Sequence, residues 1–285
     1  MEVFDTPGAM RSWSDARRVE GRRVGVVPTM GALHDGHLAL VAAARLHADV
    51  VVVSIFVNPL QFNRRDDFDA YPRPIDSDLM VCRAHGVDAV YAPTASAMYP
   101  QLFETHVEPG PLADVLEGAA RPGHFRGVAT VVAKLFGATQ PHVAVFGQKD
   151  FQQLAIIRRM NSDLDMGVEI IGLPTVRDSD GVALSSRNRR LTIEQRSAAV
   201  CVPRSLQALA DAFTGGERDA ASLVARGRAV VEGEPQARFE HLEIVHPQTL
   251  QPITTIDDAA LAVTAVWFGD VRLIDNVLLT GGHPA

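Results

Sequence analysis

Two histidines set three residues apart, His34 and His37, are the side chains in this sequence best suited to chemistry on an anion. They end the stretch Val24–His37, which reads VGVVPTMGALHDGH. An apolar run, a turn with glycine and then helical periodicity predict a strand that leads into a helix. The start of such a helix points backbone N–H groups and a positive dipole end at a bound anion. Imidazoles placed there can donate hydrogen bonds to phosphate oxygens as charge develops during phosphoryl or nucleotidyl transfer.

The turn matches neither of the two common phosphate-binding patterns, G-x-G-x-x-G and G-x-x-x-x-G-K-[ST]. Gly36, between the histidines, lets the backbone approach a ligand closely because it has no Cβ. A plainer interpretation is that one histidine caps the helix and the other is a surface residue. The spacing alone leaves both interpretations open.

A second turn repeats this plan at Gly147–Asp150, between a short apolar run and a helix predicted to begin at Phe151. Lys149 lies at the carboxyl end of a strand and the start of a helix, which suits a lysine that binds phosphate. Asp150 is a reasonable N-cap residue. Gln153 falls one turn into the helix, on the side that faces back toward the turn.

Two further candidate sites lie in predicted loops. Gln61 comes after Val50–Val57, a β-branched run typical of a strand buried on both faces. It lies beyond the carboxyl end of that strand, where open α/β sheets bind ligands, although a solvated loop glutamine is the simpler interpretation. Ser185, Ser186 and Arg187 place two hydroxyls and a guanidinium in one loop, which is either a mobile phosphate clamp or an ordinary hydrophilic loop.

The stretch 105–127 is irregular and dense in glycine, proline and charge. Glu117, Arg121, His124 and Arg126 lie close together in it. They form either a structural knot of ion pairs or a wall of the active site, and the chemistry of the residues favours neither.

The elements that position these residues follow two plans. Up to about residue 177, strand and helix patterns alternate, which predicts an α/β domain with a parallel sheet. The charged stretch Asn63–Pro74 is predicted to be a loop. A capping box at Thr192–Gln195 is expected to open a helix that runs to about Phe213. Three strand-like runs close the chain and predict a smaller α+β domain: Phe239–Val245, Leu261–Phe268 and Val271–Leu279. The expected domains are residues 1–177 and 178–285.

The chain has 285 residues and a net charge of −7, which argues against nucleic acid as the main partner. It has two cysteines, Cys82 and Cys201, and no C-x-x-C pair, so a reducing compartment is expected. The first residues hold no apolar stretch of signal-peptide length, and no run is long enough to cross a bilayer. These features predict a soluble cytoplasmic protein with no membrane partner.

The ending of PTMGALHDGH resembles the H-x-G-H signature of the nucleotidyltransferase superfamily. The whole block is similar to the pantothenate synthetase (pantoate–β-alanine ligase) family. That resemblance covers nearly the whole chain, because further blocks occur in the family's order. They are SIFVNPLQF, YPR at Tyr71–Arg73, EGAARPGHFRGVATVV, FGQKDFQQL, DGVALSSRN, and RLIDN at Arg272–Asn276.

The resemblance implies that ATP, pantoate and β-alanine give pantothenate, AMP and pyrophosphate through a pantoyl-adenylate intermediate, with Mg²⁺ on the phosphates. It also implies a Rossmann-like N-terminal domain that binds ATP and pantoate, an α+β C-terminal lid domain and a homodimer. One alternative is a nucleotidyltransferase of the same superfamily that acts on another small substrate. Another is a regulatory module that binds a nucleotide without catalysis.

The resemblance also assigns roles to residues. His34, His37, Lys149 and Arg187 would be catalytic, with His37 as the proton donor. Gln61 and Gln153 would bind pantoate and β-alanine. The metal ligands are unknown. The ATP-binding residues would be Met30, Gly31, Ala32, Leu33, His34, Asp35, Gly36, His37, Gly147, Gln148, Lys149, Asp150, Val176, Leu184, Ser185, Ser186 and Arg187.

Overall fold

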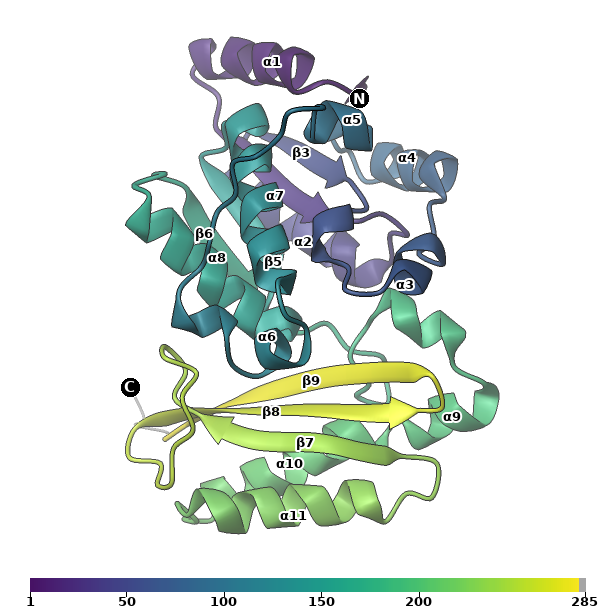
Figure 1. Cartoon of the computed structure of the whole chain (residues 1–285), viewed down its shortest axis with the longest axis vertical. Helices are drawn as coiled ribbons and strands as arrows, with labels where there is room; N and C mark the ends of the chain where they lie inside the picture. Colours follow the sequence, from purple (N-terminus) through teal and green to yellow (C-terminus); the bar gives the residue numbers. More distant parts are fainter. Residues whose placement is uncertain (282–285) are drawn as a thin grey trace. The chain divides into compact units, whose positions relative to one another are not determined.

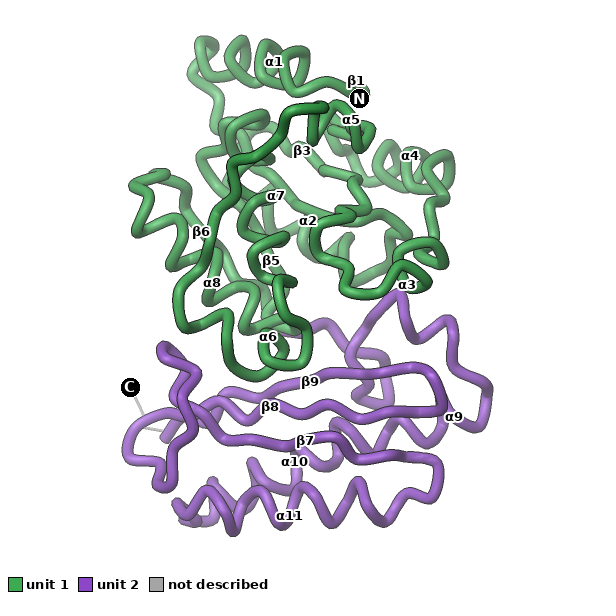
Figure 2. Tube along the Cα trace, in the orientation of Figure 1, with its two compact units in different colours: residues 1–174 green, residues 175–285 purple. Residues whose placement is uncertain are grey.

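The structure, a computed structural model, describes residues 1–281. The chain divides into two compact units, with the break between Pro174 and Thr175 (Figure 2). The boundary expected from the sequence lies after residue 177.

Unit 1 is built on a six-stranded sheet in the order β1-β4-β3-β2-β5-β6, with every adjacent pair parallel. Figure 1 shows strands of this sheet among the helices of unit 1. The predicted parallel α/β architecture is therefore confirmed. The short first strand was not predicted, because three residues carry no readable periodicity. The strands are β1 (Glu2–Phe4), β2 (Val24–Thr29), β3 (Val50–Ile55), β4 (Ala89–Tyr91), β5 (Val143–Gly147) and β6 (Glu169–Leu173).

The central strands are continuous apolar runs because both faces of the sheet are covered. In β2, Val26 faces a core shared with α1, α7 and α8, and its neighbour Val27 faces a second core shared with α2 and α4. Val52 and Val53 of β3 divide between the two cores in the same way. The alternation of side chains along a strand thus produces three layers, helices on either side of one sheet.

The helices of unit 1 match the predicted pattern with one correction. The charged stretch 63–74 is not wholly a loop, because it contains α3, whose acidic residues Asp66 and Asp67 suit the first turn of a helix. The helices are α1 (Pro7–Val19), α2 (Asp35–His47), α3 (Arg65–Asp69), α4 (Ile75–Ala84), α5 (Ala95–Met98), α6 (Glu117–Ala120), α7 (His124–Thr139) and α8 (Phe151–Asp163). The short 3₁₀ turns are η1 (Pro59–Gln61), η2 (Pro111–Ala113) and η3 (Gln148–Asp150).

Unit 2 is α+β, as predicted, with an antiparallel sheet in the order β7-β8-β9 and helices α10 and α11 packed on it. The predicted capping box is present, since Thr192 and Gln195 cap each other's backbone. The expected single helix to residue 213 is wrong. It breaks before Cys201, and Pro203, which cannot donate a backbone hydrogen bond, falls in the first turn of the next helix. The elements are η4 (Ser186–Arg190), α9 (Ile193–Ala198), α10 (Cys201–Thr214), α11 (Ala220–Glu232), β7 (Arg238–Val245), β8 (Ala259–Phe268) and β9 (Val271–Thr280).

Among residues 1–281, no helix is both long and apolar enough to cross a membrane.

Candidate active site

The segment Met30–His37, which we term the histidine turn, follows β2 and includes the first three residues of α2. His34 is the N-cap residue of α2, and its Nδ1 accepts a hydrogen bond from the backbone N–H of Gly36 at 3.2 Å. The Nδ1 of His37 in turn accepts from the backbone N–H of His34 at 3.3 Å. The two rings lie 4.1 Å apart between centroids. The histidines therefore form a reciprocal cap, and neither ring is exposed, so the plainer interpretation is right about the cap and wrong about a surface residue.

The tautomer of His37 follows from this cap. Because Nδ1 accepts a hydrogen bond, the proton of the neutral ring is on Nε2, which can donate to a ligand. Burial and, to a smaller extent, the neighbouring His34 together lower the pKa of His37 to about 3, although Asp150 partly offsets the shift. Without ligand, His37 is thus a neutral hydrogen-bond donor near neutral pH.

A buried carboxylate that the sequence analysis missed fixes the first half of the histidine turn. Asp78, on α4, accepts hydrogen bonds from the backbone N–H groups of Ala32 and Leu33, each at 2.8 Å. Gly31 and Ala32 both have positive φ angles, +84° and +52°. A Cβ on Gly31 would lie only 2.8 Å from Oδ2 of Asp78, so glycine is needed for this close approach.

Gln61 is buried, so the interpretation of this residue as a solvated loop glutamine is wrong. Its Oε1 accepts from Nδ2 of Asn58 at 2.9 Å, and its Nε2 donates to Sδ of Met30 at 3.2 Å. Asn58 also donates to the carbonyl of Gly127 and accepts from the hydroxyl of Tyr99. Gln61 is therefore held beside the first residue of the histidine turn, and Asn58, which the sequence analysis did not single out, holds it there.

The stretch 105–127 supports the backbone of Gln61. The carbonyl of Gln61 accepts from Nδ1 of His124 at 2.8 Å and from Nη2 of Arg121 at 3.2 Å. Burial and, to a smaller extent, the charge of Arg121 lower the pKa of His124 to about 4. Arg126 forms an ion pair with Glu108 instead. Arg121 and His124 thus support the backbone of Gln61, whereas Arg126 forms its ion pair within the stretch 105–127.

The second predicted turn lies where expected, after β5. Gln148 donates to the carbonyl of Gly172 on β6, and Lys149 lies in η3. Asp150 occupies the N-cap position of α8, but its side chain makes no capping hydrogen bond. Its charge acts instead on the pKa of both His37 and His124. Gln153 lies half-buried in the first turn of α8.

The strand order places these turns together. β2 is hydrogen-bonded to β3 on one side and to β5 on the other, and the chain reverses its direction of winding between β2 and β5. Open α/β sheets bind ligands at such a switch point, outside the carboxyl ends of the strands. The turns that follow β2, β3 and β5 carry His37, Gln61 and Lys149 respectively.

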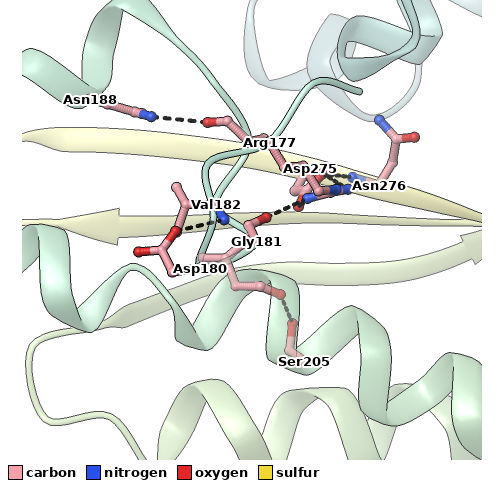
Figure 3. A network of polar contacts seen from close by, with 10 residues as sticks. Arg177, Asp180, Gly181, Val182, Asn188, Ser205, Asp275 and Asn276 are labelled. Carbon is pink, nitrogen blue, oxygen red and sulfur yellow. Dashed lines mark hydrogen bonds and ion pairs between the residues drawn. The ribbon is translucent and has the colours of Figure 1, made fainter. Parts of the chain in front are cut away.

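The remaining predicted site residues belong to unit 2. The backbone N–H of Leu184 donates to the carbonyl of Val176 at 2.9 Å, so these two predicted ATP-binding residues are adjacent. The segment Leu184–Arg187, which we term the clamp loop, includes the first two residues of η4. The Ser185 hydroxyl accepts from the backbone N–H of Arg187 at 3.2 Å. Figure 3 shows the polar network at the base of this loop.

A parallel α/β sheet with the histidine turn at its switch point defines the class, an open α/β protein that binds ligands at the carboxyl ends of its strands. The chain belongs to the pantoate–β-alanine ligase family, whose model matches residues 2–278, so the predicted family is confirmed. Pantothenate synthetase 1 of Bradyrhizobium diazoefficiens is 52% identical to it over 95% of each chain.

Two solved structures agree with this assignment. The chain superposes on pantothenate synthetase from Thermus thermophilus with a TM-score of 0.93 and 44% identity, covering 99% of this chain and 100% of that one. It also matches the pantoate–β-alanine ligase of Francisella tularensis, solved with a βγ-ATP ligand and β-alanine, with a TM-score of 0.80, 32% identity and 99% of each chain covered. The predicted enzyme class, an ATP-dependent ligase, is confirmed by these relatives.

Proposed function

We propose that the chain makes pantothenate in two steps, with pantoyl adenylate held in the site between them. In the first step a carboxylate oxygen of pantoate attacks the α-phosphorus of ATP, and the bond to the pyrophosphate oxygen breaks. In the second the unprotonated amine of β-alanine attacks the acyl carbon, AMP leaves and the amide forms. The family supports the overall ATP-dependent condensation, and the two-step order is our proposal.

The observation that carries the proposal is the donor set at the switch point. The neutral ring of His37 presents an Nε2–H, and the turn after β5 brings Lys149 and the negative Asp150 to the same edge of the sheet. We assign His34, His37 and Lys149 to the phosphates of ATP. Negative charge on the α-phosphate and the departing pyrophosphate peaks in the transition state, so donors fixed there act on rate more than on ground-state binding.

For His37 we propose hydrogen-bond donation first and proton donation only after ATP binds. A ring whose pKa lies near 3 carries no extra proton at neutral pH. The negative phosphates of bound ATP would raise that pKa, because a nearby opposite charge favours the protonated form. The proton-donor role that the family resemblance implies thus depends on the ligand.

Gln61 and Gln153 are proposed to bind pantoate through its hydroxyl and carboxylate groups, since amides can both donate and accept. The rigid support of Gln61 by Asn58 and His124 favours this assignment, because a fixed amide discriminates between ligands better than a mobile one.

The clamp loop is proposed to supply further phosphate donors, with Arg187 giving a charged, bidentate contact. Mg²⁺ is proposed to accompany ATP, held mainly by phosphate oxygens and water. The imidazoles and the ammonium named above suit the phosphates and not the cation. In the part of the chain that the structure describes, no group of three or more His, Cys, Asp or Glu side chains is placed to hold a metal ion.

Isotope exchange tests the two-step order. Pantoate alone should drive exchange of labelled pyrophosphate into ATP, and β-alanine should not be required. Exchange that depends on β-alanine would remove the separate adenylate. An AMP assay with each substrate omitted in turn separates the rivals, because a nucleotidyltransferase would leave a nucleotidylated product and a regulatory module would form no AMP.

We also propose a homodimer in the cytoplasm. The family resemblance supports the homodimer. The two buried free thiols, Cys82 and Cys201, are consistent with a reducing compartment, which supports the cytoplasm. Light scattering during size-exclusion chromatography measures the mass in solution, and a mass near 30.8 kDa would contradict the dimer.

A further inference from the structure

An ion pair in unit 2 joins the last strand to the segment that precedes the clamp loop. Asp275 of β9 accepts from both terminal nitrogens of Arg177, Nη1 to Oδ2 at 2.6 Å and Nη2 to Oδ1 at 3.0 Å. The Asp275 side chain is 1% exposed and that of Arg177 is 32% exposed. Figure 3 shows the two side chains pointing toward each other. This bidentate geometry fixes the direction of the guanidinium as well as its position.

The same guanidinium is bonded to the turn that leads to the clamp loop. Nη1 of Arg177 donates to the carbonyl of Gly181 at 3.0 Å. The carboxylate of Asp275 is fixed in turn, because Oδ1 also accepts from the backbone N–H of Asn276 at 2.8 Å. A continuous chain of polar contacts therefore runs from the backbone of β9 through Arg177 to residue 181.

The backbone passes this restraint on to the clamp loop itself. Arg177 and Ala183 form an antiparallel bridge, and Asp178 donates to the carbonyl of Val182 within the same small hairpin. The second arm of the hairpin continues directly into Leu184. On the far side of the loop, Nδ2 of Asn188 donates to the carbonyl of Ala183 at 3.0 Å (Figure 3). The position of Arg177 thus sets where the clamp loop begins.

We propose that Arg177 and Asp275 are positioning residues for adenylation, which hold the clamp loop in place without touching substrate. The inference rests on the proposed phosphate role of Arg187. An ion pair with a buried carboxylate often adds little to stability compared with an apolar pair of similar volume, so we assign this pair the role of specifying one arrangement of the hairpin. Here that arrangement includes a third contact, to Gly181, which a role confined to holding the sheet together would not need.

The main test is single-turnover formation of pantoyl adenylate by Asp275→Asn, which keeps the shape of the side chain and removes its charge. A displacement of about 1 Å at a reacting group can cost about 10²-fold in rate, so we expect a loss between about 10- and 100-fold. Arg177→Lys keeps the positive charge but not the bidentate hydrogen bonding of the guanidinium, so its rate of adenylation should fall by a smaller factor. It also serves as the test if Asp275→Asn does not fold.

Leu223→Ala is the control for stability, because Leu223 is fully buried in the core between α11 and the sheet of unit 2 and lies outside the polar network of the hairpin. It should lower the unfolding temperature and leave the adenylation rate of the folded enzyme unchanged. If Asp275→Asn behaves like Leu223→Ala, the pair is merely structural and the inference is wrong.

A double-mutant cycle separates positioning from an independent effect. If Asp275 acts through the clamp loop, Asp275→Asn should have little further effect on the rate once Arg187 is changed to alanine. If the double variant is slower by the product of the two single-variant factors, the two residues act independently and the inference is overturned. If Arg187→Ala alone leaves adenylation unchanged, the proposed phosphate role fails and the inference falls with it. If Arg187→Ala is slow and Asp275→Asn is not, only the inference falls.

Discussion

The histidine turn of unit 1 and the clamp loop of unit 2 are proposed to meet the same kind of ligand, yet the chain holds them differently. In the histidine turn the restraints act on the segment itself. Asp78 binds two of its N–H groups, and the two histidines cap the helix that follows. In the clamp loop the long-range restraint lies before the segment, at Arg177 and Asp275, and the Ser185 hydroxyl makes only a local contact.

This contrast separates two physical tasks. Donors that stabilise charge in a transition state work best when they need no rearrangement, which suits a turn between a buried strand and a capped helix. A loop restrained at its base keeps freedom along its length, which suits a segment that orders around a ligand. We therefore expect changes in the histidine turn to act mainly on the chemical step, and changes in the clamp loop to act on ordering by substrate as well.

The largest effect is expected for the donors themselves. Loss of one such donor typically costs about 10²–10³ in rate, and His37→Ala and Lys149→Ala should each slow adenylation by about that factor. Single-turnover kinetics measure the rate, and thermal unfolding checks the fold. His47→Ala, at the exposed far end of the same helix, is the control and should leave the rate unchanged. A folded His37→Ala variant of normal rate would reduce His37 to a helix cap.

A smaller effect is expected when the support of the turn is weakened. Asp78→Asn keeps the side-chain shape but replaces one acceptor oxygen with a donor that faces an N–H. The free energy of unfolding of the variant should be about 1–3 kcal/mol lower than that of the wild type. Its rate of adenylation should be about 10-fold lower. Asp76→Asn, exposed on the same helix, is the matched control. Stability that falls without any change of rate would show that Asp78 supports the fold and not the site.

Gln61→Ala tests substrate assignment within the rigid part of the site. One lost hydrogen bond is worth about 1 kcal/mol, so the KM for pantoate should rise about 5- to 10-fold while ATP binding stays nearly the same. Gln153→Ala should behave alike. Direct titration with ATP, beside steady-state kinetics with pantoate, makes the comparison, with the exposed Gln101→Ala as control. A large loss of ATP affinity would remove both glutamines from the pantoate site.

The support of Gln61 should also be sensitive to acid. The pKa of His124 is about 4 in the folded protein and 6.5 ordinarily, so below pH 6.5 the unfolded chain binds a proton that the folded chain does not. Its contribution to stability is therefore complete above pH 6.5 and declines as the pH falls toward 4. Between pH 7 and pH 4.5 the lowered pKa of His124 should reduce the free energy of unfolding by about 2 kcal/mol.

Urea unfolding of the wild type and of His124→Asn at both pH values isolates that contribution. The variant, which carries no ionisable ring, should lose about 2 kcal/mol less than the wild type over this interval. Equal losses in the two proteins would mean that His124 is not buried as a neutral ring.

The last prediction concerns the mobility of the clamp loop, which limited proteolysis measures without any change to the chemistry of the site. Trypsin should cut at Arg187–Arg190 in the free enzyme, where Arg189 and Arg190 are exposed, and ATP with pantoate should suppress the cut. Cleavage that is equal with and without substrates would argue that the clamp loop is as rigid as the histidine turn and does not order around a ligand.

The two regions also differ in what the sequence could predict. The histidine turn and the sheet beneath it are local patterns, so the apolar strands, the glycine and the spacing of His34 and His37 were readable directly. Asp78 was not, because its partners lie about 45 residues away in sequence. Arg177 and Asp275 are 98 residues apart, and nothing local to either predicts the pair.

Local conflicts explain the remaining differences. The helix expected to run to Phe213 breaks because Pro203 interrupts an otherwise continuous apolar pattern. The charged stretch 63–74 was assigned to a loop from its composition, yet acidic residues at a helix start favour the short α3. The simpler interpretation of Gln61 as a solvated residue fails because two of its partners, Met30 and His124, lie far from it in sequence.

Rapid-quench analysis measures directly whether a separate adenylate forms at the histidine turn. Enzyme in excess over labelled ATP would be mixed with pantoate and no β-alanine, quenched, and assayed for labelled pantoyl adenylate. A chase with β-alanine would follow. We expect adenylate that accumulates without β-alanine and converts to pantothenate and AMP on the chase. In His37→Ala it should form about 10²–10³-fold more slowly. No adenylate before β-alanine is added, or normal formation by folded His37→Ala, would contradict these expectations.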